Sequence, residues 1–435
     1  MTYHYLLDLA LILLSTKVLG LLTRKFQLPQ VVGALLAGLI LGPSMLDVLT
    51  ETDFISQLAE LGVIVLMFNA GVGTDIQELK KTGKVGFMVA LVGVLVPLAM
   101  GTGITLLGVR WGLIPSAGMV EALFIGTILT ATSVSITVET LNELGKLNTK
   151  VGNTILAAAL IDDVMGLVAL TLVSSLAGEA GSVGLILLKV ALFVVFVAAA
   201  GFAALRFFRW LYKVTNGKNL RRFPVLAFVL CLIMAYCAER FFGVADITGA
   251  YAAGLIISCT KKAKYIQSKF EPISYLLLTP VFFASIGIRA SLDQVNGRVV
   301  IFAFLLLAVA ILSKLIGCGF GARICGFSSQ ESLRVGVGMA CRGEVALIVA
   351  NRGLAMGVIS SALMTPVIIT VVSAAILTPI MLKLAYPEKG ELQPSTLTDR
   401  YAETEQLDIL SSHLLDKNRE MAETKEPLAA GKKSG

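Results

Sequence analysis

The sequence predicts an all-α polytopic membrane protein with about 13 transmembrane helices. Of its 435 residues, 56% are apolar, and the mean hydropathy is +0.84, whereas soluble domains contain about 45–50% apolar residues. Charged residues make up only 15% of the chain and cluster between long apolar runs. A transmembrane barrel would instead show alternating segments of roughly 10 residues. The apolar runs therefore indicate membrane-spanning helices.

Each predicted helix corresponds to one apolar run, and a helix needs about 20 residues to cross a bilayer. Several runs are shorter, as expected for helices that are tilted, broken or surrounded by protein. The first run lacks a basic leader and a small-residue cleavage site, so it predicts a retained helix and no signal peptide. The predicted spans, numbered in order, are residues 4–22, 30–47, 57–72, 85–108, 119–140, 151–175, 183–205, 223–239, 242–260, 272–288, 299–321, 333–354 and 361–384.

The basic residues of the loops predict the orientation. Nineteen lysines and arginines lie in odd-numbered loops and five in even-numbered loops. Cytoplasmic loops carry the excess of Lys and Arg. We therefore expect the chain to cross the lipid bilayer with its N-terminus outside and its C-terminus in the cytoplasm. These loops also explain the net charge of +7 without a nucleic-acid partner.

The chain is predicted to divide into a membrane transport domain, residues 1–385, and a cytoplasmic tail, residues 386–435. The tail changes from a charged, mildly amphipathic segment to a composition typical of disorder. It contains no G-x-G-x-x-G motif, so no nucleotide-sensing domain is expected. The six cysteines form no C-x-x-C pair, and only His4 and His413 are present. We therefore expect no resident cofactor and no histidine metal site.

An internal repeat relates the two halves of the chain. Residues 33–40 match residues 249–256 at six of eight positions, and the same offset places residues 61–72 over 277–288 and span 5 over span 12. Matched spans are seven apart in order, so their orientations are opposite. Such inverted-topology repeats are the usual frame of secondary transporters. Coincidence stays open as an alternative, because helices rich in Leu and small residues match easily.

Two spans carry interruptions at corresponding positions. Span 5 contains residues 130–135, which are mostly hydroxyl and small side chains, and span 12 contains residues 338–344 with Arg342 and Glu344. Paired interruptions predict two broken crossing helices that line a substrate site. Alternatively, the hydroxyls bond back to their own helix. We expect a structural role for Arg342 and Glu344, which either pair with each other or satisfy the broken backbone.

Two adjacent carboxylates, Asp162 and Asp163, lie inside an apolar run. An ionised carboxylate near the bilayer centre costs at least about 2.5–3.5 kcal/mol, and a neighbour of like charge adds to that cost. Fold stability does not require such a pair, so it predicts an ion or proton site. A buried pair with a local structural role is the alternative.

Lys314 lies about two-thirds along span 11, too deep to reach the interface easily, so it needs a partner. Asp162 or Asp163 is the obvious candidate. Consecutive helix positions diverge by about 100°, so one carboxylate can face Lys314 while the other faces a water-filled cavity. A purely structural ion pair is the alternative, but it leaves the second aspartate unexplained.

These motifs resemble bacterial sodium/proton antiporters of the monovalent cation:proton antiporter-2 family over about residues 5–385. The resemblance is carried by residues 28–33, 41–44, 130–133 and 161–163 together with Lys314. It implies a homodimer with a dimerisation part, a mobile core bundle around spans 5, 6, 11 and 12, and elevator-like alternating access. In that family the second aspartate binds the ion, the first pairs with the lysine and a Thr-Ser region lines the site. Here these are Asp163, Asp162, Lys314, Thr132 and Ser133.

The expected function is therefore secondary active exchange of Na⁺ or Li⁺ for protons, with no enzymatic activity. Asp163 is the expected Na⁺ ligand, for which cation and proton compete. The resemblance also implies electrogenic exchange of two protons for one sodium. Lys314 is the expected carrier of the second proton if cation binding to the aspartates frees it to deprotonate; in the alternative it is only a structural partner. Potassium/proton exchange, as in the Kef-type branch, stays open, and a cation channel is a more distant alternative. An aspartyl protease is disfavoured, since its two carboxylates lie on separate helices.

Overall fold

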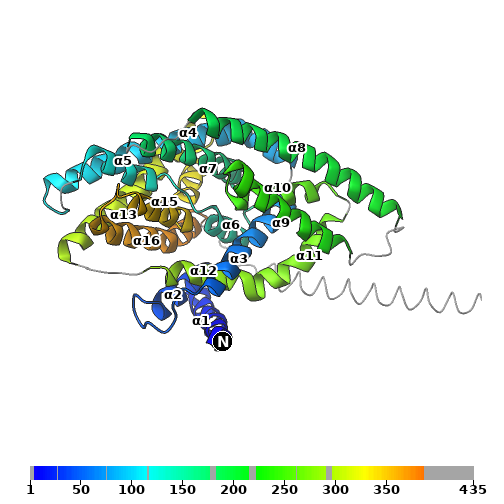
Figure 1. Cartoon of the computed structure of the whole chain (residues 1–435), viewed down its shortest axis with the longest axis horizontal. Helices are drawn as coiled ribbons and strands as arrows, with labels where there is room; N and C mark the ends of the chain where they lie inside the picture. The colour runs from blue at the N-terminus through cyan, green and yellow to red at the C-terminus, as the bar shows by residue number, and fades with distance from the viewer. Residues whose placement is uncertain are drawn as a thin grey trace, which may run out of the picture. The chain divides into compact units, whose positions relative to one another are not determined.

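The structure, a computed structural model, describes residues 4–26, 28–74, 76–114, 117–176, 183–214, 222–260, 262–290 and 296–386. Within these ranges every regular element is a helix (Figure 1), so the predicted all-α class is confirmed there. Nine helices of this part are long and apolar enough to cross a membrane. The count of 13 spans and the inverted repeat stay predictions, and residues 387–435 of the predicted tail lie outside the described residues.

The helices follow the predicted apolar runs. The first half contains α1 (His4–Lys25), α2 (Gln30–Leu41), α3 (Asp53–Gly73), α4 (Ile76–Arg110), α5 (Met119–Ile128), α6 (Val134–Glu143), α7 (Lys150–Leu176) and α8 (Val183–Val214). The second half contains α9 (Arg222–Phe242), α10 (Asp246–Ser258), α11 (Ala263–Ile273), the π-helix η1 (Ser274–Leu278), α12 (Thr279–Ile288), α13 (Gly297–Ile324), α14 (Ser329–Gly338), α15 (Glu344–Ala355) and α16 (Ser361–Ala385).

Local sequence explains where several helices begin and end. Asn296 caps α13 by accepting the backbone N–H of Val299 at 2.9 Å, and Ser328 with Glu331 forms a capping box at the start of α14. The end predicted for span 2, residue 47, is wrong: α2 ends at Leu41. Pro43 follows closely, and the residue before a proline is disfavoured in the helical conformation.

Both predicted interruptions are present. The chain unwinds between α5 and α6 and again between α14 and α15. The two unwound segments contact each other, because the backbone N–H of Ser133 donates to the carbonyl oxygen of Cys341 at 3.0 Å. Gly343 allows this approach, since a Cβ there would lie 2.7 Å from Ser133 Oγ. Four half-helices therefore end at one place inside the protein.

Close backbone contacts at glycines divide most of the helices into two groups. In the first helix group, Gly38 of α2 lies against Ala284 of α12, and Gly71 of α3 lies against Tyr251 of α10. In the second helix group, Gly317 of α13 lies against α4. Among the described glycines, no such contact joins the groups. The first helix group comprises α1, α2, α3, α9, α10 and α12; the second comprises α4, α5, α7, α13, α14 and α15, with α6 held by the unwound segments.

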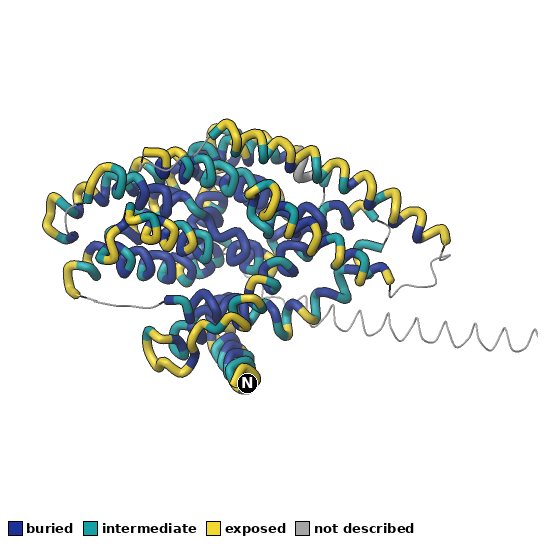
Figure 2. Tube along the Cα trace, viewed as in Figure 1, coloured by how far each residue is buried: buried dark blue, intermediate teal, exposed yellow. Residues whose placement is uncertain are grey.

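The two helix groups can be followed in Figure 1, where α5, α13 and α15 lie to the left and α9 and α10 to the right. Buried residues concentrate where helices meet (Figure 2). Helix α8 is the exception, since only 6% of its most apolar stretch is buried. Its exposed side chains include Leu188, Val194 and Phe202. A large exposed apolar surface of this kind marks a contact with a membrane or a partner.

Gly38→Ala is expected to lower the melting temperature of the detergent-solubilised protein by several degrees, because the new Cβ meets the carbonyl of Ala284 and forces α2 from α12. Gly83→Ala is the matched control: its Cβ enters open space, and alanine favours a helix by up to about 1 kcal/mol over glycine. Equal melting temperatures for the two variants would contradict the close contact of α2 and α12.

Candidate cation and proton site

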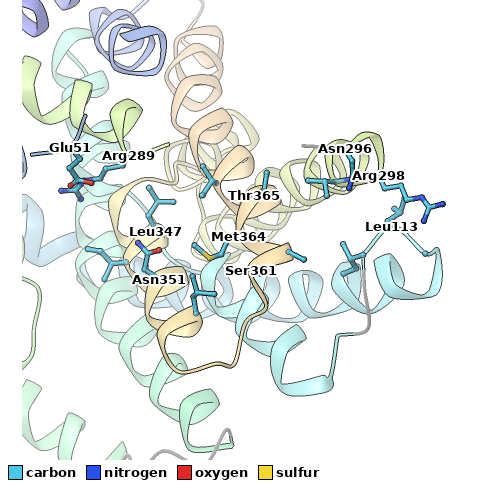
Figure 3. A pocket seen from close by; sticks show the side chains of 17 residues that line it. Glu51, Leu113, Arg289, Asn296, Arg298, Leu347, Asn351, Ser361, Met364 and Thr365 are labelled. Carbon is cyan, nitrogen blue, oxygen red and sulfur yellow. The ribbon is translucent and has the colours of Figure 1, made fainter. Parts of the chain in front are cut away.

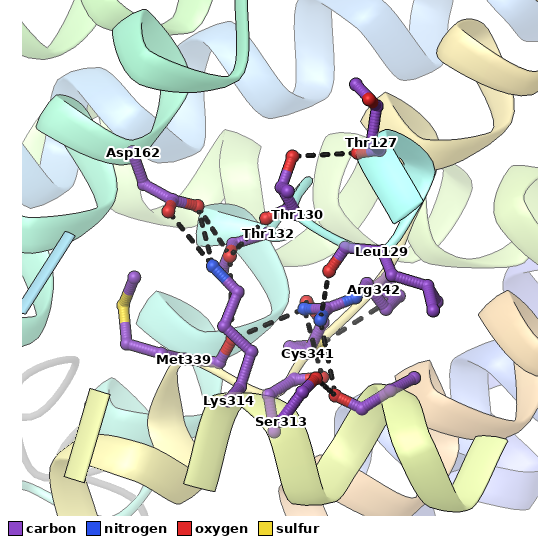
Figure 4. A network of polar contacts seen from close by, with 12 residues as sticks. Thr127, Leu129, Thr130, Thr132, Asp162, Ser313, Lys314, Met339, Cys341 and Arg342 are labelled. Carbon is purple, nitrogen blue, oxygen red and sulfur yellow. Dashed lines mark hydrogen bonds and ion pairs between the residues drawn. The ribbon is translucent and has the colours of Figure 1, made fainter. Parts of the chain in front are cut away.

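Asp162 and Lys314 form a buried ion pair at the centre of the second helix group (Figure 4). Lys314 Nζ on α13 lies 2.9 Å from Asp162 Oδ1 and 3.0 Å from Oδ2 on α7. Thr132, in the unwound segment after α5, donates its hydroxyl to Asp162 Oδ2 at 2.8 Å. The side chains of Lys314 and Asp162 are 0% and 1% exposed. Of the two aspartates, Asp162 is therefore the partner of the lysine.

The surroundings of the pair explain how two charges are accommodated. A buried ion pair is stable only when its remaining hydrogen-bonding capacity is satisfied, and Thr132 contributes such a bond. Gly93 lets α4 pack closely against α13 beside the pair, because a Cβ there would collide with Cys318 Sγ, one turn after Lys314. Sequence reasoning missed Gly93, because a glycine within a helix gives no sign of what lies opposite.

Asp163 has a different environment from its neighbour. It lines a cavity of about 600 Å³, to which Asp162, Thr130 and Glu344 also contribute. Its Oδ2 atom is buried and accepts no hydrogen bond from any residue that the structure describes. An unsatisfied buried acceptor costs about 1–3 kcal/mol, and more when it is charged. A bound cation or proton would satisfy this oxygen.

The cavity lies between the two helix groups. Glu60, Glu239 and Asp246 line it from the first group and Asp163 and Glu344 from the second. The carboxylates of Glu60, Glu239 and Asp246 approach within 4.8 Å of one another. All three lie near helix ends that face loops predicted to be outside. Acidic walls raise the local concentration of cations. Sequence reasoning missed these carboxylates, because Glu60 is far from Glu239 and Asp246 in the chain and the three follow no motif.

The two predicted hydroxyl ligands have separate partners. Thr132 contacts Asp162, as described above, whereas Ser133 Oγ donates to Glu344 Oε2 at 3.2 Å. Ser135 Oγ donates to the other oxygen, Glu344 Oε1, at 3.1 Å. Glu344 thus connects the start of α15 to the start of α6. The described contacts place neither hydroxyl on Asp163.

Arg342 satisfies the carbonyls freed by the two interruptions. Its side chain is fully buried, and its guanidinium donates to the carbonyl oxygens of Leu129 at 2.6 Å and of Cys341 at 3.2 Å (Figure 4). The same group reaches Ala310 on α13 at 3.3 Å. Arg342 was expected either to pair with Glu344 or to satisfy the broken backbone. The described contacts show the second arrangement. A positive charge there also offsets the negative ends of α5 and α14.

A second cavity, of about 940 Å³, is lined by residues of α13, α15 and α16 (Figure 3). Glu51 and Arg289 lie together at one side of it and are ion-paired at 2.7 Å. Arg289 also donates to Ser56 at 2.9 Å. Among the described lining residues Glu51 is the only carboxylate. Because that charge is already paired, the cavity at Asp163 is the better candidate for a cation.

The fold and this site define a class: secondary transporters that bind their substrate ion where broken helices meet. Comparison with known proteins gives the family. The model for "Sodium/hydrogen exchanger, transmembrane" matches residues 10–385. The chain therefore belongs to the sodium/hydrogen exchanger family of multi-pass membrane antiporters, which exchange cations for protons.

Relatives cover nearly the whole chain. It is 37% identical over 391 residues to the Na(+)/H(+)-K(+) antiporter GerN of Bacillus cereus, covering 89% of this chain and 98% of that protein. It is 35% identical over 379 residues to a Na(+)/H(+) antiporter of Enterococcus hirae, covering 86% and 96%. The structure of the sodium proton antiporter MjNhaP1 from Methanocaldococcus jannaschii shares the fold, with a TM-score of 0.63, 18% identity and coverage of 87% and 97%.

Lys314→Gln is expected to destabilise the protein by about 3–5 kcal/mol, because it leaves Asp162 buried without its cation. Adding Asp162→Asn removes the orphan charge and should recover most of that loss. Thermal unfolding in detergent measures both effects. A double variant as unstable as Lys314→Gln alone would show that the charge pair is not the source of the instability.

Proposed function

We propose that this protein exchanges Na⁺ or Li⁺ for protons across the bacterial cytoplasmic membrane, with Asp163 as the carboxylate that binds each in turn. The observation that carries this proposal is the buried Oδ2 of Asp163, which lies in the cavity without a partner. Asp162 is already engaged by Lys314, so Asp163 is the carboxylate of the pair left available. Hard cations prefer oxygen ligands, which this cavity offers.

Exchange follows from the cost of moving an uncompensated charge. An ionised carboxylate near the bilayer centre costs at least about 2.5–3.5 kcal/mol. Asp163 therefore crosses readily only when a cation or a proton neutralises it, and it cannot hold both. Thr132 and Ser133 lie at the same junction, where hydroxyl and carbonyl oxygens complete the coordination of a partly dehydrated cation. Binding of one substrate excludes the other, which couples their fluxes.

The two helix groups supply the moving parts of alternating access. The second helix group, which holds Asp162, Asp163 and Lys314, corresponds to the mobile core bundle. The first helix group corresponds to the dimerisation part of a homodimer. In this arrangement the 13 spans form inverted-topology repeats, and the cavity at Asp163 opens toward the outside, where the loop charges place the N-terminus. The family membership and the glycine contacts within each group support this division.

The ion pair makes the exchange electrogenic. While the site is empty, Asp162 holds Lys314 in its charged form. Cation binding to the two aspartates competes with that pair, so that Lys314 releases its proton as the second proton of the cycle. Moving one net charge per cycle is worth about 2.3 kcal/mol per 100 mV. Two protons then enter for each sodium that leaves, as in the two-aspartate branch of the antiporters.

Potassium is a second candidate substrate. The relative GerN is named as a Na(+)/H(+)-K(+) antiporter, and its sequence covers nearly this whole chain. Selectivity depends on the size of the cavity and on the number of ligands. The side chains around Asp163 decide both properties. An assay with Na⁺, Li⁺ and K⁺ in turn shows which of these cations the protein exchanges.

Asp163→Asn should reduce sodium-driven proton flux to background while the protein stays folded, because the amide keeps the size of the side chain but neither titrates nor binds as an anion. The measurement is the proton flux of proteoliposomes on addition of Na⁺, Li⁺ or K⁺. Asp53→Asn, at an exposed aspartate outside both cavities, is the matched control and should transport normally. Sodium-dependent flux in folded Asp163→Asn would refute the assignment, and a dominant potassium response would favour the second substrate.

The double variant Asp162→Asn with Lys314→Gln separates a proton-carrying lysine from a structural one. If Lys314 carries the second proton, the double variant exchanges one proton per sodium, and its reversal potential becomes independent of voltage. The measurement is the reversal of sodium-coupled flux in liposomes under a membrane voltage imposed without a potassium gradient, with the native protein as the control. A voltage-dependent reversal in the folded double variant would exclude the carrier role of Lys314 and leave the exchange itself intact.

A further inference from the structure

Glu143, the last residue of α6, caps the N-terminus of a different helix. Its Oε2 accepts the backbone N–H of Gln30 at 2.7 Å and its Oε1 accepts that of Val31 at 3.3 Å. Helix α2 begins after Pro29, which supplies no side-chain cap of its own. The first N–H groups of a helix lack partners within it, and they carry the positive end of its dipole. A carboxylate 113 residues away in the chain satisfies them.

This cap joins the two helix groups. Helix α2 belongs to the first group, through the contacts of Gly33 with α1 and of Gly38 with α12. Helix α6 belongs with the second, because Ser133 and Thr137 donate to the carbonyls of Cys341 and Gly338. Glu143 therefore makes a hydrogen-bonded contact, through both oxygens of its carboxyl group, across the boundary that the glycine contacts do not cross.

The cap lies at the end of α6 that is far from the proposed ion site. The N-terminal end of α6 carries Ser133 and Ser135, which contact Glu344, and Glu143 ends the helix. The loop before α2 is predicted to be cytoplasmic. The cavity that reaches Asp163 opens at the opposite ends of α3, α9 and α10. Glu143 thus closes the boundary on the side where that cavity does not open.

A cavity lies at the boundary next to the cap. It has a volume of about 300 Å³, and its lining includes Glu143, Glu139 one turn earlier, Lys17, Gln30 and Tyr275. Lys17 is engaged elsewhere, since its Nζ donates to the hydroxyl of Tyr275 at 2.6 Å. Apolar side chains of α6 and of α2 and α3 belong to one buried cluster, and the cap is the polar contact beside the place where this cavity interrupts that cluster.

We propose that the cap made by Glu143 on α2 is the contact that closes the cytoplasmic side of the transport site, and that its release accompanies opening of that side. The inference rests on the proposed alternating access. It names Glu143 as the residue that stabilises the state in which the cytoplasmic side is closed. Carboxylate hydrogen bonds to backbone N–H groups are stronger than neutral ones and break without repacking. Such a contact suits a boundary that opens and closes in every cycle, unlike the glycine contacts within each group.

The test measures which side of the protein is open, using two reporter cysteines in a variant whose six native cysteines are replaced. Leu167→Cys lines the cavity at Asp163 and reports from outside; Ala34→Cys lines the cavity at Glu143 and reports from inside. A membrane-impermeant maleimide labels Leu167→Cys in right-side-out vesicles and Ala34→Cys in inverted vesicles. Glu143→Gln keeps the size of the side chain but replaces one acceptor oxygen by an amide NH₂, and it should raise the inside-to-outside ratio of labelling rates about tenfold, since one of the two hydrogen bonds to α2 is lost.

Two further variants keep this test decisive. Glu139→Gln makes the same change one turn earlier on α6, where the side chain lines the same cavity without capping α2, and should leave the ratio unchanged. Gln30→Pro removes the donor that bonds Oε2, and proline is tolerated at the first position of a helix; it should shift the ratio as Glu143→Gln does. If Glu143→Gln does not fold, Gln30→Pro still tests the role of the cap.

Cation-driven proton flux is measured on the same proteins. If folded Glu143→Gln or Gln30→Pro shows an unchanged labelling ratio, the proposed role of the cap is wrong. Normal cation-driven proton flux in the same protein would then leave the proposed function standing. A shifted ratio in Glu143→Gln and Gln30→Pro, but not in Glu139→Gln, supports it. If the native protein exchanges no cation for protons, the proposed function fails, while the labelling ratio still decides whether Glu143 closes this side.

Discussion

The structure depends on one constraint, the need to hold the charge of Lys314 inside an apolar protein. Asp162 supplies the opposite charge at 2.9 Å, and Thr132 supplies a further hydrogen bond to that carboxylate. Because a buried charge without a partner costs several kcal/mol, α7, α13 and the unwound segment after α5 must meet at one point. Gly93 of α4 leaves room for Cys318, one turn after Lys314 on α13. The ion pair therefore fixes how the second helix group is packed.

Unwinding two helices at this point creates a second cost, which Arg342 and Glu344 offset. Freed backbone carbonyls need donors, and those of Leu129 and Cys341 receive them from Arg342. Glu344 accepts the hydroxyls of Ser133 and Ser135 and so joins the two broken helices. With its backbone satisfied in this way, the junction is rigid, and Asp163 stands beside it with an oxygen that no described residue satisfies. The unsatisfied oxygen of Asp163 beside this junction is the feature on which the proposed exchange site rests.

Contacts within the helix groups and contacts between them differ in kind. Within each group, glycines bring backbones together, as Gly38 does with Ala284, and such packing is lost if the helices move apart. Between the groups, a shared apolar cluster is flanked by a cavity with acidic walls on one side and by the cap of Glu143 on the other. The close backbone contacts within each group and the polar groups at their boundary are what the proposed motion of one group against the other would use.

The sequence by itself determined the class of fold, most helix positions, both interruptions and the residues of the charge pair, because hydropathy and the cost of burying a charge are local properties. Residue spacing alone left open which aspartate Lys314 contacts, since either of two adjacent helix positions can face it, and only the resemblance to a known family pointed to Asp162. It assigned Thr132 and Ser133 to one site, but they contact Asp162 and Glu344. Only the tertiary structure revealed Gly93 and the cap of Glu143 on α2, because packing alone brings together residues more than a hundred positions apart.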